Sequence, residues 1–109
     1  PDMLAVYEDA TASVEEDTGS VEIPARIYAA LAAAQIAANR QRAAILATLR
    51  RSTSYAENPW AAVLRAEIIA QDGDVEKTNA AVMEARNQLT KSRIPVLNQR
   101  LTKLESRLR

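Results

Sequence analysis

The chain of 109 residues contains no Cys and no His, which excludes disulfides, thiolate chemistry and the usual zinc and imidazole sites. Ala, Leu, Arg, Gln and Glu dominate and only two Gly are present, so the composition predicts an all-α fold, because these residues lose least on entering a helix. The net charge of zero conceals a separation: residues 1–24 carry seven carboxylates and no Lys or Arg, whereas the remainder carries all 14 basic residues and seven acidic ones.

The first segment, residues 1–23, shows neither helical nor sustained strand periodicity. It is predicted to be an extended acidic arm, separate from a helical body at residues 24–109, with a short strand at residues 21–23. Its apolar residues are too many for a purely solvated tail, so we expect part of the arm to dock on a protein surface. The acidic residues that we expect to take part in this docking are Glu8, Asp9, Glu15, Glu16 and Asp17.

A single long helix is predicted from Pro24 to about Arg51. Proline is favoured in the first turn, where its missing N–H removes no helical hydrogen bond, and Ala occupies 11 of the 23 positions from Ala25 to Ala47. Small side chains along one stripe let a neighbouring helix approach closely. We therefore expect an antiparallel bundle of three to four helices in which this alanine-rich first helix is the longest.

Two further helices are predicted around a tight turn. Asn58 can cap a helix at residues 59–71, whose first residue is a proline. Gly73 can adopt a positive φ in the turn that follows, and Asp74 can cap the next helix, at residues 75–91. The pattern predicts an antiparallel helical hairpin.

The last predicted helix starts at Pro95, because proline removes a hydrogen-bond donor and disfavours helical geometry at the residue before it. The apolar residues of this segment are spaced by 3 and 4 and form a coiled-coil-like seam of about two heptads: Ile94, Leu97, Leu101, Leu104 and Leu108. A seam of this length can pack on the first helix or on another chain. We treat it as a candidate partner interface.

Basic residues follow the same segment, and three of them occupy one heptad position directly beside the seam: Arg93, Arg100 and Arg107. Cations beside a seam commonly select an acidic partner surface. Phosphate binding and plain solvation are the alternatives, although no aromatic residue is interleaved with these cations as single-stranded nucleic acids require. We include the three arginines in the candidate interface.

No catalytic, cofactor-binding or metal-binding residues are expected. Without His or Cys, a nucleophile would have to be an activated Ser or Thr, and the three Lys residues are predicted on exposed helix faces. The two isolated Gly residues exclude a phosphate-binding loop, and the acidic residues near Gly73 lack the spacing of a calcium-binding EF-hand loop. The only Trp, Trp60, is expected to pack over the end of a neighbouring helix.

The location is expected to be the cytoplasm or an assembled particle. The first residues lack the basic and apolar regions of a secretory signal. The alanine-rich segment is interrupted by charged and amide side chains and is therefore not a bilayer span.

Three functions remain open. The first is a structural or assembly subunit, for example a small component of a virion or a secretion-type machine, whose body oligomerises while the acidic arm reaches a basic surface; opposite charges on separate segments favour such self-association. The second is a nucleic-acid binder that uses the Arg-rich C-terminal helix. The third is an adaptor or chaperone that binds another protein through the seam. The first is favoured because it alone uses both the arm and the seam.

Overall fold

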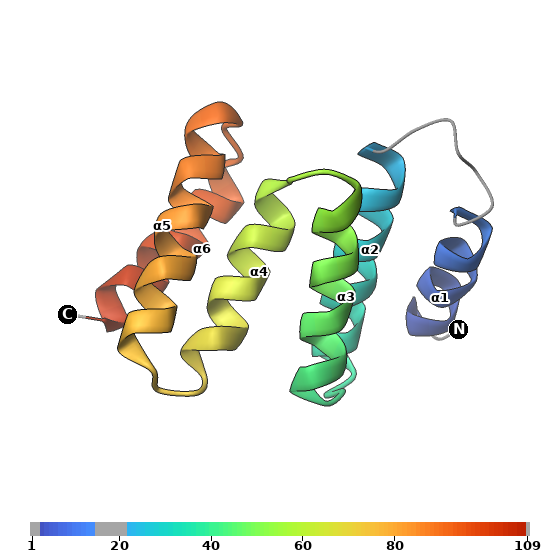
Figure 1. The fold of residues 1–109 in the computed structure, drawn as a ribbon, viewed down its shortest axis with the longest axis horizontal. Helices are drawn as coiled ribbons and strands as arrows, with labels where there is room; N and C mark the ends of the chain where they lie inside the picture. The colour runs from blue at the N-terminus through green and yellow to red at the C-terminus, as the bar shows by residue number, and fades with distance from the viewer. Residues whose placement is uncertain (1–2, 15–21, 109) are drawn as a thin grey trace.

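The computed structural model describes residues 3–14 and 22–108, and all of the regular structure in these ranges is α-helical. The six helices within them are α1 Met3–Val14, α2 Glu22–Ala37, α3 Arg42–Tyr55, α4 Pro59–Ala70, α5 Val75–Lys91 and α6 Pro95–Arg107. Along the longest axis, α5 and α6 lie at one end, followed by α4, then α3 with α2 behind it, and α1 at the other end (Figure 1). The all-α prediction is confirmed, but the number of helices was underestimated.

The predicted starts of the later helices agree with the structure. The Asn58 carboxamide oxygen accepts a hydrogen bond from the Ala61 backbone N–H at 2.9 Å, and the Asp74 carboxylate accepts one from the Lys77 N–H at 3.1 Å. Gly73 has a φ of +76°, a left-handed conformation that glycine adopts without steric cost. These local signals correctly define α4, α5 and the turn between them.

The prediction of one long helix from Pro24 to Arg51 is wrong, because the chain turns between α2 and α3. Asn39 adopts a φ of 55°, a conformation that Asn tolerates better than most residues. The Arg40 N–H donates to the Gln35 carbonyl at 3.0 Å and the Asn39 N–H donates to the Ile36 carbonyl at 3.1 Å. This is the Schellman pattern of a helix C-terminus, and it lets the two halves of the alanine-rich segment pack on each other as a hairpin.

The prediction of an extended arm over residues 1–23 is wrong wherever the structure describes this segment. Residues 3–14 form α1, and α2 begins at Glu22, so residues 22 and 23 are helical and not part of a strand. Leu4 is buried and packs in a cluster with Tyr28 and Leu31 of α2. The apolar residues of the acidic segment therefore order it against the body, while the predicted acidic residues 15–17 lie outside the described ranges.

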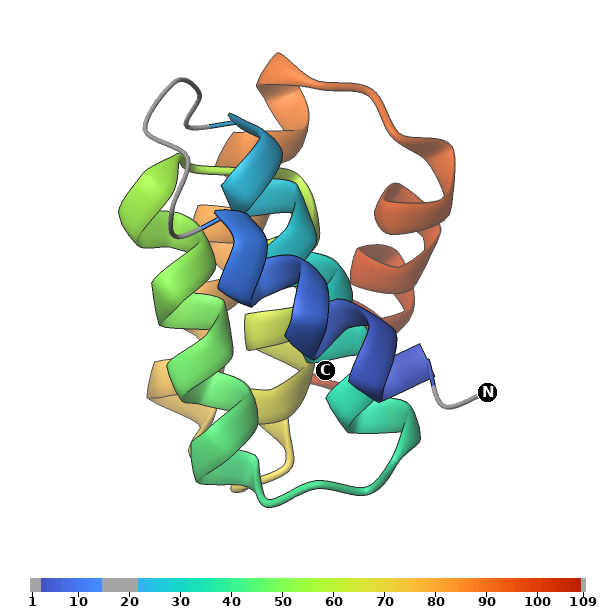
Figure 2. The same cartoon turned by 90° about the vertical axis from the view of Figure 1, so that its right-hand side faces the viewer.

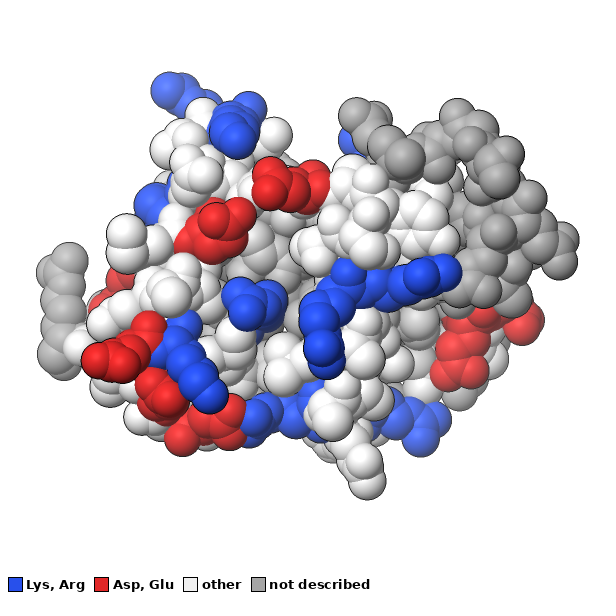
Figure 3. Space-filling model, in the orientation of Figure 1, with Lys and Arg blue, Asp and Glu red and all other residues white. Residues whose placement is uncertain are grey.

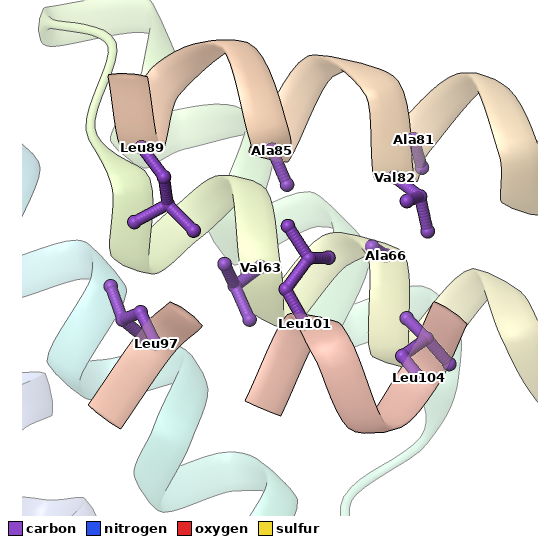
Figure 4. Close-up of a cluster of buried hydrophobic side chains, with 9 residues drawn as sticks. All are labelled: Val63, Ala66, Ala81, Val82, Ala85, Leu89, Leu97, Leu101 and Leu104. Atoms are coloured by element: carbon purple, nitrogen blue, oxygen red, sulfur yellow. The ribbon is translucent and has the colours of Figure 1, made fainter. Parts of the chain in front are cut away.

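The core consists of two main clusters that share α4. One cluster joins α4 to α5 and α6 (Figure 4) and includes Val63, Ala85 and Leu101. The other joins α4 to α2 and α3 and includes Leu49 and Leu64. Because α4 contributes buried residues to both clusters, it is the central element of the fold.

None of the described helices is long and apolar enough to cross a bilayer.

Candidate protein-interaction cleft

An opening lined by residues of both helices lies between α2 and α6; in Figure 1 these two helices run behind α3 and α5. Both helices pack against α4, but no Cα atoms of α2 and α6 come within 8 Å of each other. Figure 2 shows α6 set apart from α2 and α1 on this side. The opening contains two hollows, one toward each end of α4, which we call the alanine hollow and the cationic hollow.

The alanine hollow has a volume of about 1040 Å³ and lies near the N-terminal end of α4. One wall is the alanine face of α2, and the others carry larger apolar side chains; the lining includes Ala30, Ala33, Ala37, Leu4, Trp60 and Ile94. Trp60 is 38% exposed, so the indole borders this hollow and is not enclosed as the sequence suggested. The alanine side chains of this wall allow another backbone to approach closely, while Arg26 of α2 and Glu57 also line the hollow.

The cationic hollow has a volume of about 670 Å³ and lies toward the C-terminal ends of α4 and α6. Its apolar lining comes from three helices and includes Ile36, Ile68, Leu104 and Leu108. Along α6 it is bordered by Arg100, Lys103 and Arg107. These three cations are spaced by 3 and 4, so they share one face of the helix.

The charge of the cationic hollow is only partly neutralised. The Arg100 guanidinium pairs with the Glu67 carboxylate, with the Nε to Oε2 distance at 3.1 Å. Lys103 and Arg107 form no ion pair with any carboxylate in the described part of the chain. The hollow thus presents two unpaired cations beside an apolar surface, which is the arrangement that an amphipathic acidic segment would complement.

The predicted interface residues of the leucine seam differ in how deeply they are buried and in which hollow they border. Leu97 and Leu101 are fully buried in the chain's own core and Leu104 is 5% exposed, so in a single copy α4 and α5 already cover most of the seam (Figure 4). Ile94 borders the alanine hollow, whereas Leu104 and Leu108 border the cationic one.

Of the three predicted arginines, Arg100 and Arg107 border the cationic hollow and Arg93 is exposed near the start of α6, outside both hollows. The sequence analysis missed Lys103 as a member of this set. Its position between Arg100 and Arg107 at helical spacing was the signal that could have identified it.

The predicted acidic residues that the structure describes, Glu8 and Asp9, lie on α1, at the opposite end of the molecule from α6 (Figure 1). Glu8 and Asp9 are exposed on α1, and Figure 3 shows acidic side chains both at the α1 end and over the opposite end of the molecule. The same view shows basic side chains over α3 and α4, in the middle of the molecule. The two predicted sets of charges therefore do not meet within the described part of one copy.

No group of three or more Asp, Glu, His or Cys side chains in residues 3–14 and 22–108 is arranged to hold a metal ion. The cleft has largely apolar walls, with cations of α6 along the border of the cationic hollow. Comparison of the chain with protein-family models, with curated proteins and with solved structures found no match.

Proposed function

We propose that this protein is a non-catalytic assembly subunit that associates with further copies of itself through the cleft between α2 and α6. The observation that carries the proposal is that both helices pack against α4 while no Cα atom of α2 comes within 8 Å of a Cα atom of α6. Apolar side chains of α2, α4 and the start of α6 therefore border an open hollow of about 1040 Å³.

The composition of the alanine hollow favours a protein occupant. Contiguous exposed apolar surface on a small protein commonly marks an interaction site, and helix axes come within about 8 Å of each other where the contact residues are small. Trp60, 38% exposed at the border, belongs to the residue type that most often contributes a large share of binding energy at interfaces.

The first prediction tests the alanine hollow with Ala33→Arg. Ala33 is exposed on α2 and borders the hollow, so the arginine adds bulk and charge where a neighbouring copy would approach. The assembly should weaken, with an increase in Kd of about tenfold or more, measured as mass against concentration by light scattering.

The matched control is Ala47→Arg, because Ala47 is an exposed alanine of α3 that borders neither hollow. Circular dichroism should give the same helicity for both variants and the original chain, since Arg is a good helix former. If Ala33→Arg assembles as strongly as Ala47→Arg, the alanine hollow is not the contact surface. A monomer at all concentrations of the original chain would contradict self-assembly and favour an adaptor that binds a different protein.

A second candidate function is nucleic-acid binding, which the unpaired Lys103 and Arg107 favour. Binding through phosphates releases counterions, so the affinity for a labelled DNA duplex should fall steeply as salt is raised. The assembly function is preferred because it also uses the apolar walls of the cleft, with which a phosphate backbone makes no favourable contact.

A further inference from the structure

We propose that copies of this chain associate head to tail, with the acidic α1 end of one copy seated on the cationic hollow of the next. This inference rests on the proposed assembly function and names the two surfaces that meet. It specifies a second copy as the occupant of the cationic hollow, and the α1 end as the part of that copy that docks.

Opposite charges mark the two ends of the chain. Residues 1–22 contain seven Asp or Glu and no Lys or Arg, whereas residues 75–109 contain eight Lys or Arg and three Asp or Glu. The fold places α1, which carries Glu8 and Asp9, at one end of the longest axis, and α5 and α6 at the other (Figure 1). The exposed carboxylates of α1 and the unpaired Lys103 and Arg107 of α6 therefore lie apart in one copy, an arrangement that favours attraction between two copies.

The contact cannot form within one copy while α1 is docked. Leu4, 3% exposed, fixes α1 against Tyr28 and Leu31 of α2, and α1 packs against no other described helix. The molecule extends 43 Å along its longest axis, and the cationic hollow lies toward the far end. Attraction between surface charges is largely screened beyond a Debye length of about 8 Å at physiological salt, so the two ends act on each other only between copies.

The two surfaces are also complementary in their apolar parts. On α1, Val6 is 57% exposed in the same part of the helix as the exposed carboxylates Glu8 and Asp9. In the cationic hollow, apolar side chains lie beside Lys103 and Arg107. Docking would bury the apolar side chains of the two surfaces against each other and pair the carboxylates with the unpaired cations. Such complementarity selects the partner and also fixes its orientation.

The polarity of the contact determines the form of the assembly. Each copy offers two different surfaces, one at each end, so the interface is heterologous and not a two-fold symmetric one. Every dimer keeps one free acidic end and one free cationic end. Growth should therefore continue past the dimer to a closed ring or an open filament.

The test is a charge exchange between two variants. Variant X carries Lys103→Glu and Arg107→Glu, which replaces both unpaired cations of the cationic hollow with carboxylates. Variant Y carries Glu8→Lys and Asp9→Lys, which replaces both exposed carboxylates of α1 with cations. Each variant alone should assemble about tenfold more weakly or worse than the original chain. An equimolar mixture should recover assembly, because X and Y alternate with every interface complementary.

The control is Arg50→Glu with Arg65→Glu, which makes the same change of net charge as variant X. Arg50 and Arg65 are exposed on α3 and α4 and border neither hollow. This variant should assemble like the original chain. Mass is measured by light scattering at low salt and at about 0.5 M NaCl, where the charge attraction is screened to within a few Å, and circular dichroism verifies folding.

Each outcome is decisive. If the original chain oligomerises and variant X does so equally well, or if the X and Y mixture fails to recover assembly, the head-to-tail contact is wrong while the assembly function stands. A mass that saturates at the dimer also overturns the head-to-tail contact. If the original chain is monomeric at both salt concentrations, the assembly function falls together with this inference.

Discussion

Asn58 joins three helices through its side chain. Its Oδ1 accepts from the Ala61 N–H at the start of α4, and its Nδ2 donates to Ser52 Oγ at 3.0 Å. The Ser52 hydroxyl, fully buried at the end of α3, in turn donates to the Ala25 carbonyl of α2 at 2.6 Å. A buried polar group is tolerated where its hydrogen bonds are satisfied, so this chain of bonds fixes the ends of α2, α3 and α4 relative to one another.

The prediction at this scale is that Asn58→Ala lowers the free energy of unfolding by about 2 kcal/mol, because it removes a helix cap together with its bond to the buried Ser52. Asp74→Ala is the control, since Asp74 caps α5 with an exposed bond to Lys77 and should cost about 1 kcal/mol or less. Urea unfolding followed by circular dichroism measures both values. Equal costs for the two variants would mean that the bond to Ser52 contributes nothing.

At the scale of single helices, α1 is the element with the least support. It packs against α2 alone among the described helices, and Leu4 is its one fully enclosed large side chain in the part whose burial is described. A helix of 12 residues is marginal by itself in water. The order of α1 therefore depends on the contact between Leu4 and the Tyr28 and Leu31 side chains.

We predict that Leu4→Ala releases α1 and leaves the remaining helices folded. The lost burial of a leucine is worth about 2–3 kcal/mol, enough for the α1 amides to exchange with deuterium about tenfold faster or more, while α4 and α5 keep their protection. Val6→Ala is the control, because Val6 is 57% exposed and should have little effect. Hydrogen exchange by mass spectrometry measures each helix; accelerated exchange in α4 or α5 would show that α1 is part of the global folding unit.

For the whole molecule, the decisive feature is the shared use of α4. Its residues Val63 and Ala66 belong to the cluster with α5 and α6, while Leu64 and Ile68 belong to the cluster with α2 and α3. Neither cluster can lose α4 without exposing its own apolar surface. The two halves of the body should therefore unfold together in one transition.

The corresponding prediction uses the single Trp as a local probe. Urea unfolding followed by Trp60 fluorescence and by circular dichroism should give coincident curves. Leu64 and Leu101 belong to different clusters, and both side chains are at 1% exposure or less. Replacing either one with Ala should lower the free energy of unfolding by about 2–5 kcal/mol. For each variant, the urea midpoints of the two curves should fall by the same amount. Separate transitions for the two probes, or a variant that shifts one probe alone, would contradict a single cooperative unit.

Local sequence signals correctly predicted the features that depend on neighbouring residues alone. The cap residues Asn58 and Asp74, the turn at Gly73 and the break before Pro95 all act within a few positions of themselves, and each is found where it was expected. No helix end was predicted at Asn39, because Asn takes the left-handed conformation less readily than Gly and the alanine-rich sequence around it favours a continuous helix. The apolar residues of α1 were identified from the sequence, but a helix was not predicted there, because the order of α1 depends on its packing against α2.

The candidate cleft could be predicted only in part. The alanine face, the cations of α6 and the separation of charge along the chain are properties of the sequence by itself, because they need no knowledge of distant contacts. The tertiary structure decided that the leucine seam is covered by α4 and α5, and that α2 and α6 both pack on α4 with no Cα atoms within 8 Å of each other. Both results depend on which apolar helix faces pack most favourably on α4. These contacts join residues far apart in the chain, and no local sequence pattern encodes them.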